Sequence, residues 1–240
     1  MPDRDLVVAA FTELAPDYEP TVDGELRMFW GVSYRDFLAR LLDVATVAGG
    51  EVMLDVATGT AYLPMQIADR LGPSGRIYGL DITPAMLASG AMKLDAGGHQ
   101  ARSSLVCGSA LEMPLADASF DAVLCALGMH HIDVTGLVSE MYRVLRPGGR
   151  IVVADVCANA FWRSLAGALL LRILIVGYGL ALHSVRARAE IDAFDNVRTA
   201  SDWRLLLADH GYTDIALHEV RPRFPWYPGG FIARAVRPQS

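Results

Sequence analysis

Two aspartates stand where apolar runs give way to turns, and their placement suits the binding of a small polar ligand. Asp55 lies near the end of the apolar run 52–56, and a turn of small residues, 57–61, follows it. Asp81 directly follows the next apolar run, 76–80. Ligands of open α/β sheets bind beyond the carboxyl ends of the strands, and a carboxylate there can accept hydrogen bonds from two vicinal hydroxyls. We therefore expect a ligand site at this edge, with Asp81 on a ribose.

The turn lacks the glycine fingerprint of a dinucleotide site. Two of its small positions, Ala57 and Ala61, are alanine, so no G-x-G-x-x-G pattern is present and a nicotinamide cofactor is disfavoured. Structural roles remain open for both acids. Asp55 could serve only as a partner for a helix terminus, and Asp81 could cap the helix that Thr83 and Pro84 are predicted to open.

A histidine pair, His130 and His131, follows the fourth predicted strand, on the same side of the sheet. A histidine near its ordinary pKa can act as general base toward a weakly acidic hydroxyl. Alternatively, the pair merely opens the next helix, and adjacent residues there point in different directions, so at most one should act chemically. The three cysteines, Cys107, Cys125 and Cys157, have no zinc-type spacing, and the sequence predicts no metal site.

Short strands alternating with helices must position these residues. Strands are predicted at 52–56, 76–80, 104–107, 121–125, 151–156, 215–220 and 230–236. An apolar helical stripe from Val134 to Leu145 is expected to end at Pro147-Gly148-Gly149, and Ser201 is expected to cap a later helix. The alternation predicts an α/β fold with a doubly wound, Rossmann-like, mostly parallel sheet of seven strands.

Composition narrows the class of protein. The chain has 240 residues, of which 52% are hydrophobic and 20% charged, which argues against disorder. The net charge of -6 and the lack of a basic run disfavour a nucleic-acid partner. The odd number of cysteines and the absence of a secretion signal at the N-terminus favour a reducing cytoplasm.

Five motifs in order resemble the class I S-adenosylmethionine-dependent methyltransferases, whose first motif is approximately Asp-x-Gly-x-Gly-x-Gly. They are residues 55–61, 79–81, 108–114, 119–121 and 143–149, and they cover about residues 50–156. The lead-in from Phe11 to Tyr18 further resembles the ubiquinone/menaquinone C-methyltransferase group. The resemblance implies an S-adenosylmethionine cofactor and methyl transfer to a small, rather apolar acceptor, such as a quinone, a phenol or a secondary metabolite.

The resemblance also implies roles for individual residues. Asp55 would orient the ammonium group of the cofactor, Asp81 would bind its ribose, and Ile82 would pack on its adenine. Ser109 stands where many relatives have aspartate, and its hydroxyl would accept the bond from the adenine amine. The residues assigned to the cofactor are Tyr18, Asp55, Ala57, Thr58, Gly59, Thr60, Asp81, Ile82, Ser109, Ala110 and Leu111.

Two other functions stay open at this point. The fold could bind the cofactor and catalyse a cyclisation or decarboxylation in which the sulfonium acts electrostatically. It could also serve as a non-catalytic interaction protein, because fold does not determine function.

Two segments outside the strand pattern are predicted to cover the substrate. Residues 1–48 read as a helical cover with an aromatic group, and residues 157–198 read as a helical insertion in the methyltransferase domain 49–240. The N-terminal aromatic group is Phe29, Trp30, Tyr34 and Phe37.

The apolar stretch from Leu165 to Leu182 approaches the length of a membrane span. A span is disfavoured because Arg172 at its middle would cost about 2.5 to 3.5 kcal/mol and because the chain has to return to complete its sheet. We expect a helical lid over an apolar pocket; a core or dimer helix and a membrane-surface helix are the alternatives. The chain would accordingly be a monomer or a homodimer.

Overall fold

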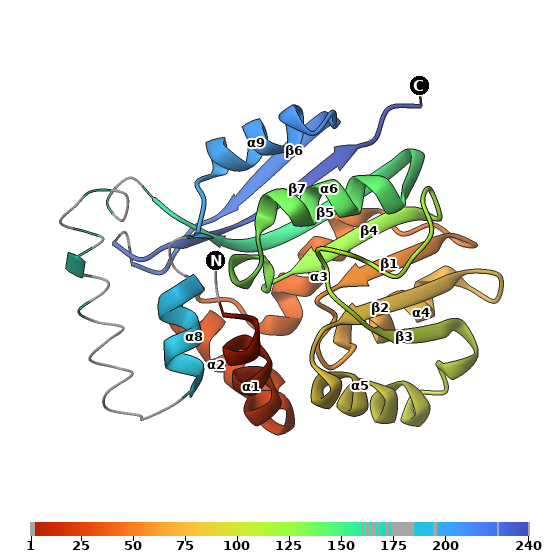
Figure 1. The fold of residues 1–240 in the computed structure, drawn as a ribbon, viewed down its shortest axis with the longest axis horizontal. Helices are drawn as coiled ribbons and strands as arrows, with labels where there is room; N and C mark the ends of the chain where they lie inside the picture. The colour runs from red at the N-terminus through yellow and green to blue at the C-terminus, as the bar shows by residue number, and fades with distance from the viewer. Residues whose placement is uncertain are drawn as a thin grey trace.

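Seven strands form one sheet in the computed structural model, which describes residues 3–159, 161, 164, 167, 169–170, 173, 185–193, 196–224 and 226–239. The strands are β1 (Val52–Val56), β2 (Arg76–Asp81), β3 (Ser103–Cys107), β4 (Phe120–Ala126), β5 (Leu145–Cys157), β6 (Thr213–Val220) and β7 (Gly229–Val236). Their order is β3-β2-β1-β4-β5-β7-β6, and β7 runs antiparallel to both of its neighbours. The predicted doubly wound, mostly parallel sheet is thus confirmed (Figure 1).

Helices cover both faces of this sheet. The helices of the described chain are α1 (Arg4–Leu14), α2 (Tyr18–Trp30), α3 (Tyr34–Ala45), α4 (Tyr62–Leu71), α5 (Pro84–Ala96), α6 (Val134–Val144), α8 (Val185–Ala193) and α9 (Ala200–Asp209), with a 3-10 turn η3 (Met129–His131). Of these, α1 and α8 pack chiefly against each other. Successive residues of β4 belong to different cores. Val123 packs in the cluster with α6 and α9, whereas Leu124 packs in the cluster with α3 and α4. Both side chains are fully buried, as the two-residue period of a sheet covered on both faces requires.

The third N-terminal helix belongs to the covering layer of the sheet. Phe37, on α3, is fully buried, and its core cluster includes sheet residues of β1, β4 and β5. Trp30 packs against Phe37 with ring centroids 5.3 Å apart. From the predicted cover 1–48, the residues that reach the ligand pocket described below come from α1 and the first residue of α2.

Two predicted helix ends were wrong. The helix α6 ends at Val144, and β5 begins at Leu145, so Pro147-Gly148-Gly149 lies inside the strand segment, where the register against β4 shifts. The helix α9 is capped by Thr199 rather than Ser201. The Thr199 hydroxyl accepts a hydrogen bond from the Asp202 amide at 3.1 Å, and the Asp202 carboxylate accepts one from the Thr199 amide at 3.0 Å.

The predicted insertion 157–198 is described in part. β5 ends at Cys157, and α8 packs beside α1 near the carboxyl ends of the strands (Figure 1). The predicted lid helix from Leu165 to Leu182 lies for the most part outside the described residues. Among the described residues, no helix combines the length and the apolar character needed to cross a membrane.

The turn after β1 has an unusual backbone. Three alternate residues adopt the left-handed conformation, with φ of 55° at Ala57, 55° at Gly59 and 57° at Ala61. These are the glycine positions of the Asp-x-Gly-x-Gly-x-Gly motif, and an alanine there costs roughly 1–2 kcal/mol. Glycines opposite make room for the two extra methyl groups. A Cβ on Gly90 would lie 2.8 Å from the Ala61 Cβ, and a Cβ on Gly128 would lie 3.0 Å from the Ala57 Cβ.

Gly90→Ala is expected to destabilise the protein by about 1–3 kcal/mol. The steric cost of the added methyl group against the turn should exceed the gain in helix propensity from glycine to alanine. Urea unfolding measures the effect. Gly24→Ala, inside α2 with nothing within 4 Å of its added Cβ, is the matched control and should stabilise by roughly 0.5–1 kcal/mol.

The double variant Ala61→Gly/Gly90→Ala should recover part of the stability lost in Gly90→Ala. A double variant whose loss equals the sum of the two single effects would show that the two positions are not coupled through this contact.

Candidate functional site

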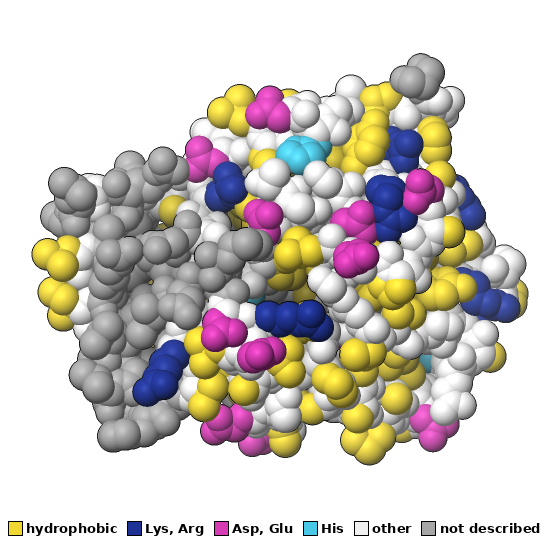
Figure 2. Space-filling view, viewed as in Figure 1, with side chains coloured by type: hydrophobic (Ala, Val, Ile, Leu, Met, Phe, Trp, Pro, Cys, Tyr) yellow, Lys and Arg dark blue, Asp and Glu magenta, His cyan; other side chains and the backbone are white. Residues whose placement is uncertain are grey.

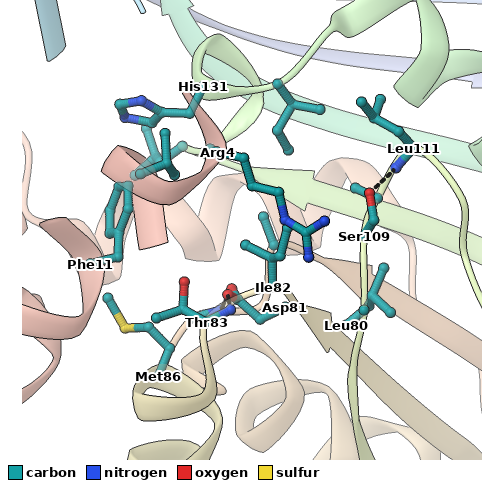
Figure 3. A pocket seen from close by; sticks show the side chains of 18 of the residues that line it. Arg4, Phe11, Leu80, Asp81, Ile82, Thr83, Met86, Ser109, Leu111 and His131 are labelled. Atoms are coloured by element: carbon teal, nitrogen blue, oxygen red, sulfur yellow. Dashed lines mark hydrogen bonds between the residues drawn. The ribbon is translucent and has the colours of Figure 1, made fainter. Parts of the chain in front are cut away.

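A pocket opens at the carboxyl ends of β1, β2 and β4, beneath α1 (Figure 3). The sequence-predicted residues that line it are Tyr18, Ala57, Gly59, Asp81, Ile82, Ser109, Ala110, Leu111 and His131. Asp55, Thr58, Thr60 and His130 are not part of the lining formed by the described residues. The structure therefore divides the predicted site into residues that face a ligand and residues that hold them in place.

Asp81 ties two loops together at the floor of the pocket. Its Oδ2 accepts a hydrogen bond from the Gly59 amide at 2.8 Å, and its Oδ1 accepts one from the Thr83 amide at 2.8 Å. Each carboxylate oxygen has a second lone pair, so both can still accept from a ribose hydroxyl. The capping alternative is partly realised, since Asp81 bonds the amide at the start of α5, whereas Thr83 makes no side-chain cap.

Asp55 is buried directly beneath the turn. It is 2% exposed, and the Thr58 hydroxyl donates to its Oδ2 at 2.7 Å. Burial raises the pKa of Asp55 to about 7 against the opposing effect of the Thr58 bond, and the charge of nearby Asp81 adds to the rise. Thr58 therefore positions Asp55, and an ammonium group near this carboxylate would relieve an unfavourable buried charge.

Glu19 supports the turn from the side of α2. Its carboxylate accepts from the Thr60 hydroxyl and from the Lys93 ammonium on α5. These bonds lower the pKa of Glu19 in spite of the opposing effect of burial. Thr60 thus connects the turn to the N-terminal helices. Tyr18, which precedes Glu19 in the chain, lies at the pocket wall.

Another part of the pocket wall combines apolar side chains with the hydroxyl of Ser109. Ile82 and Met86 face the cavity from the loop after β2 and from α5, while Ser109 faces it from the loop after β3 (Figure 3). The Ser109 Oγ accepts a hydrogen bond from the Leu111 amide at 3.2 Å. An adenine ring fits these residue types, because apolar side chains can cover its faces and a hydroxyl oxygen can accept from its amine.

The two histidines have different environments, although their ring centroids are 4.2 Å apart. His130 Nδ1 lies 2.7 Å from Asp155 Oδ1, and the pKa of His130 rises to about 9 through Asp155 although burial opposes it. His131 has a pKa lowered to about 4 by burial and by the neighbouring His130. At neutral pH His131, which lines the pocket, is therefore the neutral member of the pair and His130 the charged one.

The sequence interpretation missed the part of the pocket that α1 supplies. Arg4, Val7 and Phe11 line it, and Figure 3 shows the Arg4 side chain reaching into the cavity toward Ile82. Their spacing of three and four residues places them on one face of a helix, which was the available signal. Glu190, whose carboxylate lies 3.7 Å from His131 Nε2, was also missed. No sequence pattern links it to residues some sixty positions earlier.

We expect Asp55→Asn to stabilise the ligand-free protein at high pH. The folded state holds the Asp55 proton to about pH 7 and the unfolded state releases it near 4, so this stability is present below pH 4 and is lost as the pH rises to 7. Asparagine keeps the neutral form, so the variant should be more stable than wild type at pH 8 by up to about 4 kcal/mol.

Thermal unfolding between pH 4 and pH 8 tests this, with the exposed Asp43→Asn as a control for removing one negative charge. The same stability difference between Asp55→Asn and wild type at both ends of the range would contradict a raised Asp55 pKa.

Comparisons with known proteins show which family this chain is similar to. Residues 54–153 match the family model described as a methyltransferase domain. The chain is 36% identical over 142 residues to a demethylmenaquinone methyltransferase of Anoxybacillus flavithermus, covering 58% of this chain and 60% of that protein. It is 32% identical over 154 residues to a ubiquinone/menaquinone biosynthesis C-methyltransferase of Paracoccus denitrificans, covering 62% and 58%.

The matched region thus spans about 60% of the length of these relatives. In fold, the chain is similar to the crystal structure of an S-adenosylmethionine-dependent methyltransferase from Aquifex aeolicus, with a TM-score of 0.63 at 17% identity over 92% of this chain and 98% of that one. In its ordered motifs and sheet topology the chain is similar to the class I S-adenosylmethionine-dependent methyltransferases, and its residues 54–153 match a methyltransferase domain.

Proposed function

We propose that this chain transfers a methyl group from S-adenosylmethionine to a small, apolar acceptor with a quinol-like or phenolic ring. The observation that carries the proposal is the composition of the pocket beyond Asp81. Val7, Phe11, Leu127 and Ile132 gather there beside His131. Such a wall favours a hydrophobic ring with few polar groups, and the names of the similar proteins, demethylmenaquinone methyltransferases, support an acceptor of this class.

The cofactor would lie along the turn after β1. Asp81 would accept from the ribose hydroxyls, Ile82 and Ser109 would contact the adenine, and buried Asp55 would attract the ammonium group. When bound, S-adenosylmethionine supplies an electrophilic methyl group on a positively charged sulfur. The protein needs no nucleophile of its own for this transfer. Its contribution is to align the acceptor and to exclude water.

His131 is the residue we assign to the acceptor's proton. It is neutral at pH 7 and lies on the pocket wall, so it can accept a hydrogen bond or a proton from a ring hydroxyl. His130 is already protonated and bonded to Asp155, so it cannot serve as the base. This assignment agrees with the expectation that one member of the pair acts chemically.

The charge of the protein supports a class of substrate, and its cysteines support a type of compartment. Described basic and acidic side chains intermingle on the face seen in Figure 2, and the net charge is -6, which supports a small-molecule substrate over nucleic acid. All three cysteines are unpaired, which supports a reducing compartment such as the cytoplasm.

The direct test is a product assay with the purified chain, S-adenosylmethionine and a panel of reduced naphthoquinols, benzoquinols and simple phenols. We expect S-adenosylhomocysteine to accumulate and one acceptor to gain the mass of one methyl group. Tight cofactor binding with no methylated product from any ring acceptor would reject the proposed acceptor class and favour a cofactor-binding enzyme of other chemistry.

Asp81→Asn and Asp81→Ala should both weaken S-adenosylmethionine binding, by about 1.5–3 kcal/mol for loss of the hydrogen bonds to a charged acceptor. Calorimetry measures the affinity, and Asp95→Asn, exposed on α5, is the matched control. If Asp81→Asn folds and binds the cofactor as tightly as wild type does, Asp81 has no part in ribose binding.

A further inference from the structure

Three side chains from two distant parts of the chain meet at the edge of the pocket. His130 Nε2 lies 3.8 Å from Glu190 Oε2, and His131 Nε2 lies 3.7 Å from Glu190 Oε1. The three ligand atoms of this cluster all lie within 4.8 Å of one another. The histidines come from the turn η3, whereas Glu190 comes from α8, so the cluster forms only when α8 packs against η3.

A buried carboxylate orients the first histidine. Asp155 is 2% exposed and lies at the end of β5. Its Oδ1 is 2.7 Å from His130 Nδ1, and its Oδ2 accepts from the His130 amide at 2.9 Å. A carboxylate on Nδ1 fixes one proton there, so the proton on Nε2, which faces Glu190, is the one that a metal ion would displace. The same carboxylate–histidine pairing supports the ligands of many metal sites.

The second histidine is held in place by packing. The side chain of His131 is 4% exposed, and Phe11 contacts the ring edge-on at a centroid distance of 5.1 Å. Its Nδ1 has no hydrogen-bond partner in the described part of the chain. The side chain of Glu190 is 35% exposed, so the cluster can be reached from solvent on that side.

The charges around the cluster suit a divalent cation. The acids are Glu190, Asp155 and Glu25, and among the described residues the cations that pair with them are Arg186 and the protonated His130. The Arg186 guanidinium lies 2.8 Å from Glu25 and 3.4 Å from Glu190. Three carboxylates against one guanidinium leave two negative charges once a bound ion has displaced the proton on His130 Nε2.

We propose that His130 Nε2, His131 Nε2 and Glu190 bind one divalent transition-metal ion, with zinc as the species that fits the ligands. Two imidazole nitrogens and one carboxylate oxygen are typical zinc ligands, and Mg²⁺ and Ca²⁺ would prefer oxygen ligands. Ligand atoms of a tetrahedral zinc site are separated by about 3.3 Å, so three ligand atoms that lie within 4.8 Å of one another have to draw together by up to about 1.5 Å. Three protein ligands leave a fourth position open.

The open position gives the ion a place in the reaction, a step that rests on the proposed function. His131 lines the pocket, so a ring oxygen of the acceptor could occupy the fourth position. With the ion bound, His131 Nε2 would be a ligand and no longer the proton acceptor, so the acceptor hydroxyl would release its proton to water, and the methyl group would then pass from sulfur to the activated acceptor. The ion would also join α8 to η3 and thereby close the pocket edge.

Metal binding can be tested without cofactor or acceptor. The full chain, freed of metal with a chelator, is titrated with Zn²⁺ by calorimetry and with Co²⁺ by visible absorption. We expect one ion per chain, the visible bands of Co²⁺ with nitrogen ligands, and a higher melting temperature with Zn²⁺.

Variants separate this site from adventitious binding. Glu190→Gln and His131→Gln should each weaken Zn²⁺ binding at least tenfold, and Asp155→Asn should weaken it by about 10- to 100-fold. His218→Gln, which removes an exposed histidine on β6, should bind as wild type does. Circular dichroism of each metal-free variant establishes that it is folded.

Two results would overturn the proposal. One is the absence of Zn²⁺ and Co²⁺ binding to the folded wild-type chain. The other is binding that Glu190→Gln leaves unchanged. Because these titrations contain no cofactor and no acceptor, their outcome is separate from that of the methyl-transfer assay, and either proposal can fail while the other holds.

Discussion

The hydrogen bond from the Gly59 amide to Asp81 is the contact on which the ligand site depends. It joins the turn after β1 to the end of β2, and the Thr83 amide extends the same connection to the start of α5. The turn can make this approach because Ala57, Gly59 and Ala61 all have positive φ. The methyl groups of Ala57 and Ala61 fit because Gly128 and Gly90 leave space opposite them. The conformation of the turn and its close packing therefore both call for small residues at these positions.

This arrangement buries the carboxyl groups of Asp55 and Asp81 away from water, which disfavours their charged forms. Burial raises the pKa of both Asp55 and Asp81. The ligand-free fold consequently carries an electrostatic cost at Asp81 on the pocket floor and at Asp55 beneath the turn, the two positions that we propose bind a cationic, hydroxyl-rich cofactor. A ligand that supplies an ammonium group and two hydroxyl donors would remove much of that cost, so stability is exchanged for affinity at this site.

A second set of charges lies on the other side of the pocket. Arg186 on α8 bridges Glu25 of α2 and Glu190, and Glu190 in turn faces the two histidines of η3. Because α8 also packs against α1, which supplies Phe11 to the pocket, these ion pairs position the wall that an apolar acceptor would contact. The side of the pocket that we propose for the cofactor is thus built on loops at the ends of the strands, and the side that we propose for the acceptor is built largely on α1 and on the turn η3 that α8 packs against.

The sequence by itself determined the strands and the cofactor edge, and the tertiary structure decided the rest. Strands and the turn 57–61 are local, since apolar runs and turn residues specify them within a few positions. The cap of α9 was misplaced because Ser201 and Thr199 both suit a cap, and only the Asp202 partner distinguishes them. The meeting of Glu190 with the histidine pair depends on how α8 packs, and contacts between residues so far apart leave no periodic pattern in the sequence.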